Sequence, residues 1–222
     1  MSRILVDQVR SNSASGDAIT LDGNGKCAIN ATTINSLTFP TSDGSADQII
    51  KTNGSGTLSF VAAAAGITMA DSWRITSDFT GDAPSGRVSS NWERFDTSPW
   101  ENELGTGLTQ SSGIFTFPTT GYYFLHWTHY ARHNGGSAWN EMELTLTNDG
   151  GSNYTALHHT EMSWETSSTK YKKQSESAIL DITNTSQQQF YFNIAVDDNS
   201  VVTIGATHKK QTGFDIFRLG DT

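Results

Sequence analysis

The fold of this chain is decided by the segment Gly113-Ile114-Phe115-Thr116-Phe117-Pro118-Thr119-Thr120-Gly121-Tyr122-Tyr123-Phe124-Leu125. It contains a predicted strand over residues 114–117 and the start of a second one over residues 122–130, both rich in aromatic residues. Pro118 and Gly121 lie between them, and these residue types favour turns. The segment therefore predicts two strands joined by a short turn.

Both faces of the predicted strand 122–130 carry aromatic rings, although a half-solvated strand should be polar on one side. The predicted strand 189–196 likewise places Tyr191 opposite a face of core residues. Because one core buries only one face, the second face predicts a subunit interface, with a ligand groove as the competing interpretation. In the first strand one face presents Tyr123, Leu125, Trp127 and His129, and the other presents Tyr122, Phe124, His126, Thr128 and Tyr130.

The rest of the C-terminal part alternates strand patterns with turn signals, as an all-β sandwich requires. No stretch has a convincing helical period. Only 17% of the residues are charged, which leaves too few helix formers for a helical bundle. We predict further strands over residues 73–76, 92–95, 141–146, 177–182, 200–205 and 213–218.

Charge and composition exclude several classes of protein. The 222 residues include 14 basic and 23 acidic side chains, a net charge of −9 with neutral histidines, which argues against a nucleic-acid-binding protein. No apolar run approaches the roughly 20 residues of a membrane-spanning helix. Asp7 interrupts the apolar start, so we expect no secretory signal. The single cysteine, Cys27, allows neither an intrachain disulfide nor a cysteine metal cluster.

The aromatic residues divide the chain at Gly66. Phe39 and Phe60 are the only ones that precede it, so residues 1–66 lack the large side chains that anchor a core. Within them, residues 18–29 and 49–60 form a weak repeat, in which two short apolar stretches flank a turn with glycines two apart. Isolated hairpins are marginally stable in water. We therefore predict a shaft in which chains support one another, with a partly disordered linker as the alternative.

The segment 113–125 resembles the core signature of the complement-q-type and tumour-necrosis-factor-like jelly rolls, and residues 212–217 are similar to their closing strand. The upstream Phe95, Asn102 and Gly105 depart from the spacing of the family. This resemblance implies an all-β head, a ten-stranded antiparallel jelly-roll sandwich that assembles as a homotrimer. It places Tyr122, Phe124 and Tyr191 in the trimer interface. It places in the core Tyr123, Leu125, Trp127, Phe190, Phe192, Phe214 and Ile216.

The N-terminal residues 1–10 are similar to leader peptides of structural proteins from tailed phages, and residues 39–60 resemble a stretch common in phage fibres. These resemblances imply a virion-anchoring peptide over residues 1–16, an intertwined Gly/Ser/Thr-rich shaft over 17–66 and a head, or knob, over 67–222. The anchor would use Ile4, Leu5, Val6 and Val9. We expect a homotrimeric fibre of a tailed bacteriophage on the virion surface, made in the host cytoplasm without a signal peptide.

The expected function is attachment of the head to the host surface, with no bond broken. A capsid decoration or cement protein that stabilises the shell is the alternative, and a polysaccharide-degrading tailspike is less favoured. We expect no enzyme, because no Gly-x-Ser-x-Gly elbow is present and Cys27 has no nearby histidine. The acidic pair Glu141 and Glu143 fits a solvated strand face better than glycoside cleavage.

Several polar and aromatic residues are candidates for binding. Tryptophan beside amides and hydroxyls suits a glycan or protein receptor, which indicates Trp139, Asn140, His158, His159 and Trp164. We interpret His126, His129 and His133 as structural or surface residues, because their spacing on a strand does not hold one ion. Asp197 and Asp198 fit a plain turn better than a calcium site, so we expect no cofactor.

The expected partners are further copies of the chain, a phage tail or capsid protein at the N-terminus and a host-surface glycan or protein at the head. We expect no nucleic acid and no membrane insertion.

Overall fold

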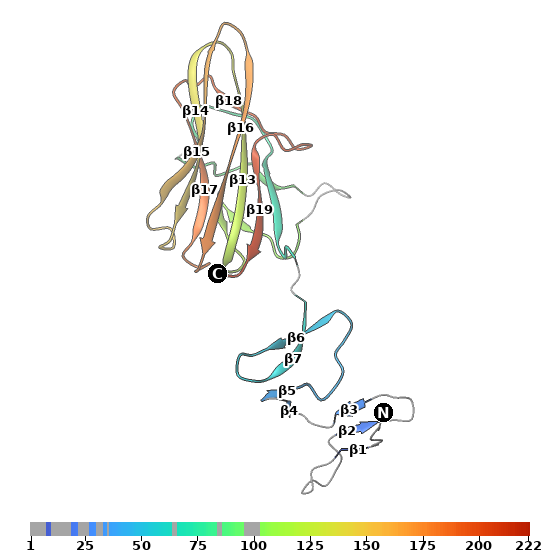
Figure 1. Cartoon of the computed structure of the whole chain (residues 1–222). Helices are drawn as coiled ribbons and strands as arrows, with labels where there is room; N and C mark the ends of the chain where they lie inside the picture. The colour runs from blue at the N-terminus through green and yellow to red at the C-terminus, as the bar shows by residue number, and fades with distance from the viewer. Residues whose placement is uncertain are drawn as a thin grey trace. The chain divides into compact units, whose positions relative to one another are not determined.

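The computed structural model describes residues 8–9, 19–21, 27–29, 33–34, 36–63, 66–83, 86–95 and 103–222. The chain divides into two compact units, Met1–Ala65 and Gly66–Thr222 (Figure 1). In these described ranges, no helix is long and apolar enough to cross a membrane.

The first unit consists of short antiparallel strand pairs. The strands β1 (Gln8–Val9), β2 (Ile19–Leu21) and β3 (Cys27–Ile29) form one sheet, β4 (Thr33–Ile34) pairs with β5 (Leu37–Thr38), and β6 (Gln48–Thr52) pairs with β7 (Leu58–Ala62). Both halves of the sequence repeat thus form hairpins, β2–β3 and β6–β7. In the second hairpin, Ile49 is 50% and Ile50 52% exposed, so the hairpin alone does not bury its apolar residues.

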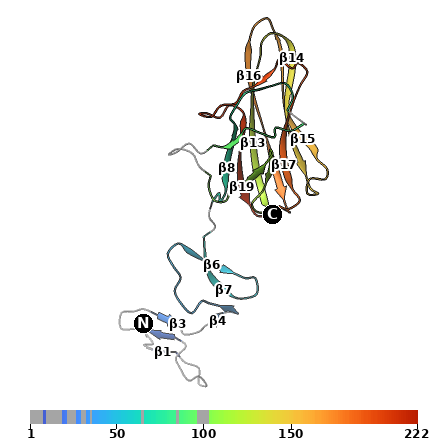
Figure 2. The same cartoon turned by 180° about the vertical axis from the view of Figure 1, so that it is seen from behind.

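The second unit, which we call the head, is a sandwich of two antiparallel sheets (Figures 1 and 2). The first sheet has the order β10 (Trp92–Arg94), β8 (Ala70–Ile75), β19 (Gly213–Gly220), β13 (Gly121–His133), β18 (Val202–Thr203) and β9 (Phe79–Thr80), with β16 (Lys170–Ile182) on the other side of β13. The second sheet has the order β11 (Thr109–Ser111), β12 (Ile114–Thr116), β17 (Gln189–Val196), β14 (Gly136–Thr147) and β15 (Thr155–Thr166).

The strand pattern departs from the prediction in several places. The sheets hold seven and five strands among the described residues, where the family resemblance implies ten, and no predicted strand covers the short β9 and β11. The edge strand β15 was not predicted, because Thr, His and Glu dominate it. The first half of β16 was also missed, since its side chains are exposed on both faces.

The core lies between the two sheets and is built from aromatic rings. Phe115, fully buried in β12, has its ring centroid 5.1 Å from that of Phe190, 4.9 Å from that of Phe214 and 5.2 Å from that of Trp73. These rings come from both sheets, and their edge and stacked contacts hold the sheets together. All seven residues that the family resemblance assigns to the core are buried, so that expectation is confirmed.

The two glycines of the decisive segment are required by close backbone approaches. Gly113 has a φ of 78°, and a Cβ atom there would lie 2.0 Å from the carbonyl oxygen of Val88. Gly121 has a φ of 141°, and a Cβ atom would lie 2.4 Å from the carbonyl oxygen of Gly220. Only glycine adopts such angles without a steric cost, so these positions set where the two strands of the segment begin.

We expect Gly113→Ala to lower the free energy of unfolding by about 3 kcal/mol, because the new methyl group adds a clash with backbone to an unfavourable φ. Gly86→Ala is the matched control. Its φ is 67°, but nothing lies within 4 Å of the Cβ position, so we expect a loss of about 1 kcal/mol. Urea unfolding followed by tryptophan fluorescence measures both, and equal losses would show that the contact with Val88 costs nothing.

Candidate functional site

The outward face of the seven-stranded sheet carries an apolar patch. In β13 the side chains alternate between buried and accessible, and Tyr122 and Phe124 belong to the accessible series. Phe124 lies directly opposite Ile179 on one side and Phe217 on the other, and opposite residues of an antiparallel pair share a face. Ile179 is 68% and Tyr122 42% exposed. We call these four residues (Tyr122, Phe124, Ile179 and Phe217) the outward patch.

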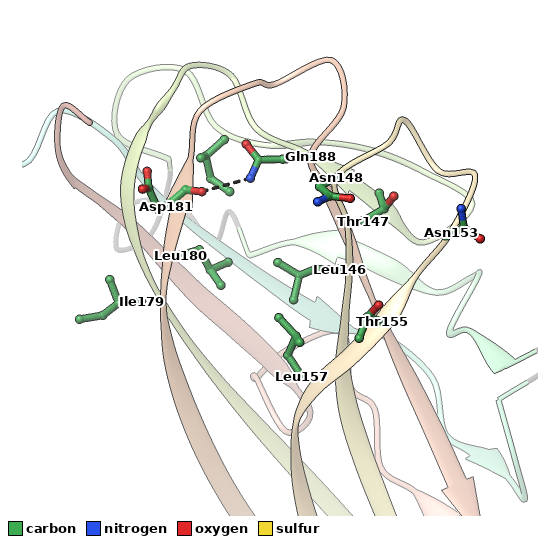
Figure 3. A pocket seen from close by; sticks show the side chains of 11 residues that line it. Leu146, Thr147, Asn148, Asn153, Thr155, Leu157, Ile179, Leu180, Asp181 and Gln188 are labelled. Carbon is green, nitrogen blue, oxygen red and sulfur yellow. Dashed lines mark hydrogen bonds between the residues drawn. The ribbon is translucent and has the colours of Figure 1, made fainter.

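An apolar groove lies beside this patch, at the edge of the sandwich (Figure 3). Among the described strands, β15 pairs only with β14 and β16 only with β13, so both are edge strands on the same side. The groove between them has a volume of about 430 Å³. At its rim the side-chain amide of Gln188 donates to the carbonyl oxygen of Asp181 at 3.1 Å. Its apolar lining consists of Leu146, Leu157, Ile179, Leu180 and Ile182.

The outward patch and the edge groove are continuous through Ile179, which contributes to both. Leu157 in the groove is 56% exposed. The two surfaces face different directions, because one covers a sheet and the other its edge. The head thus presents two adjoining apolar surfaces that share Ile179 and face different directions.

The structure does not bring Tyr191 to the outward patch. Tyr191 lies in β17, in the five-stranded sheet, with its ring 4.8 Å from that of Tyr154 and 5.8 Å from the guanidinium of Arg87. The outward faces of two sheets in a sandwich point in opposite directions. The family resemblance groups Tyr191 with Tyr122 and Phe124, but alternation along a strand identifies a face and not the sheet to which the strand belongs.

The receptor-contact prediction is wrong for two of its five residues. Asn140 is fully buried and Trp164 is 2% exposed, because both belong to the inward series of their strands. Trp139 is 37% exposed, and His158 and His159 are exposed in β15. These three therefore remain accessible to a partner, and their role stays a prediction. Of the predicted anchor, Ile4, Leu5 and Val6 lie outside the described residues, and Val9 lies in β1.

A buried polar cluster occupies the part of the head between the far ends of β13 and β14. The Nε2 atom of His129 lies 3.2 Å from the hydroxyl of Thr203 and 3.3 Å from the amide nitrogen of Asn140. His133 pairs through Nε2 with the carboxylate of Asp198 at 3.1 Å. Both histidines are fully buried, in agreement with their interpretation as structural residues. Burial lowers the pKa of His129 from 6.5 to about 3.

This cluster predicts a loss of stability in weak acid. Between pH 6.5 and about pH 3 the unfolded chain binds a proton at His129 that the folded head does not, so stability is complete above pH 6.5 and falls as the pH falls. We expect a loss of about 2 kcal/mol by about pH 5. Urea unfolding at the two pH values measures it. His129→Gln should remove this dependence, whereas the exposed control His159→Gln should keep it; an unchanged dependence in both variants would contradict the assignment.

The loop proposed as an alternative calcium site uses its carboxylates for protein contacts. The backbone nitrogen of Trp139 donates to Asp197 at 2.6 Å. Ser200 donates from its backbone to Asp198 at 2.8 Å, and this bond is the first cause of a lowered Asp198 pKa. Among the described residues, no group of three or more His, Cys, Asp and Glu side chains is placed to hold a metal ion.

A buried ionic network surrounds Asp71, a residue that the sequence patterns did not single out. The carboxylate is inaccessible to solvent and accepts hydrogen bonds from the indole of Trp73 at 2.9 Å, the Arg94 guanidinium at 2.8 Å and the backbone nitrogen of Leu108 at 2.8 Å. The signal was present in the alternation of β8, which places Asp71 on the same face as Trp73 and Ile75. The network ties three separate segments of the head together.

Comparisons with known proteins show the fold of the head. The chain is similar to the structure of Eiger TNF from S. frugiperda, with a TM-score of 0.51 and 14% sequence identity over 71% of this chain and 96% of that chain. Murine APRIL at pH 5.0 gives a TM-score of 0.48 and 12% identity over 68% and 98% of the two chains. No family model and no curated protein sequence matches the chain. The likeness to Eiger TNF confirms a TNF-like jelly roll and, at this identity, shows the fold alone.

Proposed function

We propose that the chain forms a homotrimeric fibre on the surface of a tailed bacteriophage and that its head, a jelly roll of ten principal strands, attaches the particle to the host. The observation that carries this proposal is the pair of apolar surfaces on one head, the outward patch and the edge groove. Contiguous exposed apolar residues on a sheet face usually mark a protein contact.

The relation of the two surfaces supports a closed ring of copies. An interface between two different surfaces of the same chain is head-to-tail, and it closes into a ring when the rotation between copies allows. The edge of one head, with Leu157 and Ile179, would cover Tyr122 and Phe124 of the next head. Three copies are the number that the family resemblance of the sequence implies. Tyr191, on the opposite sheet, is not part of the proposed contact.

The first unit supports the same assembly independently of the head. The hairpin β6–β7 leaves Ile49 and Ile50 about half exposed, which is costly for a hairpin that stands alone. Side-by-side hairpins from three chains would cover these residues and form the proposed intertwined shaft. The N-terminal residues 1–16 would then anchor the fibre to a tail or capsid protein, as their resemblance to phage leader peptides suggests.

Attachment through three heads requires only weak contacts. Linked binding sites raise the overall avidity far above the affinity of each site, so a single head needs no deep pocket. Trp139, His158 and His159 are the proposed receptor contacts that remain accessible. The same trimer would also serve as a capsid decoration protein, which is the second candidate. A polysaccharide-degrading tailspike is less favoured, because it needs a catalytic pair of carboxylates and Glu141 and Glu143 fit a solvated strand face better.

Immunogold labelling of phage particles that encode this chain tests the proposal. Antibodies against the head should label the distal ends of fibres, and the purified full chain should compete with these particles for adsorption to the host. Label spread evenly over the capsid would favour the decoration protein. Shortening of host polysaccharide by the purified chain would favour the tailspike.

A further inference from the structure

The tip of the head, where β13 ends and β16 begins, carries a cluster of basic side chains although the chain as a whole is acidic, with a net charge of −9. Lys170 lies opposite His133, and Lys172 lies opposite Ala131. Arg132 and Lys173 complete the group. Four of the 14 basic residues of the chain thus gather at this tip, together with Asp198, which pairs with His133.

Two tyrosines interleave with the cations on the outward face of the sheet. Arg132 lies opposite Tyr171, and Lys173 lies opposite Tyr130. The two tyrosine rings stack across the strands, with centroids 5.8 Å apart and an interplanar angle of 29°. Tyr171 is 56% exposed. These four side chains form a block of two facing pairs. The stacked rings of Tyr130 and Tyr171 lie on one diagonal of the block, and the positive charges of Arg132 and Lys173 lie on the other.

Among the described residues, the two cations of this block have no acidic partner. Within the part of the chain that the structure describes, neither Arg132 nor Lys173 forms an ion pair, and Arg132 donates instead to the amide oxygen of Asn134 at 2.9 Å. The next row on this face carries Thr128 and Ser175, which are hydroxyl residues. The first carboxylate below them on β19, Asp215, is already paired with Lys210.

We propose that this tip binds an acidic polysaccharide, a chain of sugars that bears carboxylate or sulfate groups. Sugar rings pack on exposed aromatic faces, anionic groups pair with Lys and Arg, and hydroxyl residues bond the remaining sugar hydroxyls. Charge complementarity selects this occupant, because a neutral glycan leaves the two cations unused. The inference deepens the proposed function and rests on it for the source of the polysaccharide.

Binding of the purified full chain to alginate, to dextran sulfate and to neutral dextran tests the inference. We expect binding to alginate, to dextran sulfate or to both, none to dextran, and an affinity that falls as salt rises. Binding to neither anionic polymer, or equal binding to dextran, would overturn the proposal. Tighter binding to a short DNA duplex would overturn it in favour of a nucleic-acid partner.

Charge reversal at the tip separates a specific site from the overall charge. Lys173→Glu and Arg132→Glu should each weaken binding by about tenfold or more, and Lys173→Arg should retain it. Lys51→Glu is the matched control, because it makes the same change in net charge at an exposed lysine of β6. An equal loss in Lys51→Glu would mean that no site exists at the tip.

The oligomeric state of the same variants distinguishes this inference from the proposed function. Sedimentation of Lys173→Glu and Arg132→Glu should give the same mass as the unchanged chain. A changed mass would assign the tip to contacts between copies and overturn the inference. If the unchanged chain is a monomer that still binds the anionic polymers, the inference stands and the proposed trimer fails.

Discussion

Phe124→Asp should convert the proposed homotrimer into single chains. Phe124 is the centre of the outward patch, between Ile179 and Phe217 on the two neighbouring strands. A carboxylate there would be buried without a partner in the proposed interface, at a cost of several kcal/mol for each of the three contacts. The head itself should remain folded, because Phe124 does not belong to the core. Sedimentation equilibrium should therefore report the mass of one chain, with unchanged tryptophan fluorescence.

Tyr191→Asp is the control that separates the two sheets. Tyr191 lies on the outward face of the five-stranded sheet, so we expect this variant to keep the mass of the trimer. The opposite result, in which Tyr191→Asp dissociates the protein and Phe124→Asp does not, would move the interface to the other sheet. A trimer that survives both substitutions would indicate that the shaft alone holds the chains together.

The sequence predicts best the strands whose two faces differ. The strand over residues 189–196 has the bounds predicted for it, because Phe190, Phe192 and Ile194 alternate with less apolar residues and turn signals flank both ends. The strand β15 was missed, since its inward series includes Thr160 beside Met162 and Trp164. A buried threonine in an edge strand does not mark a core face in a sequence pattern.

The candidate site could be predicted only in part, because it depends on pairing between strands. Tyr122 and Phe124 were identified from the two aromatic faces of one strand. Ile179 and Phe217 were not, since their places beside Phe124 follow from the register of β13 with β16 and β19. The basic cluster at the tip also follows from the register between strands. The lysines of residues 170–173 gain a partner in Arg132 only once the two strands are aligned.

Asp71→Ala should destabilise the head more than any exposed substitution, by about 3–5 kcal/mol. The loss has a specific cause. Removing the carboxylate leaves the indole of Trp73 and the backbone nitrogen of Leu108 without their acceptor, and it removes the charge that faces the Arg94 guanidinium. Burying unpaired donors costs more than the hydrogen bonds contribute when they are made. Urea unfolding at neutral pH measures the change.

Asp215→Ala is the matched control, on the strand that pairs with β8. Ile216, its neighbour in sequence, lies directly opposite Asp71, and Asp215 lies opposite Ser72 on the outward face. Its carboxylate pairs with Lys210 where solvent reaches both, so its removal should cost about 1 kcal/mol or less. Equal losses in the two variants would mean that the buried network contributes no more than a surface ion pair. A large difference would show that the network of Asp71, which joins β8, β10 and the segment before β11, stabilises the head more than a surface ion pair does.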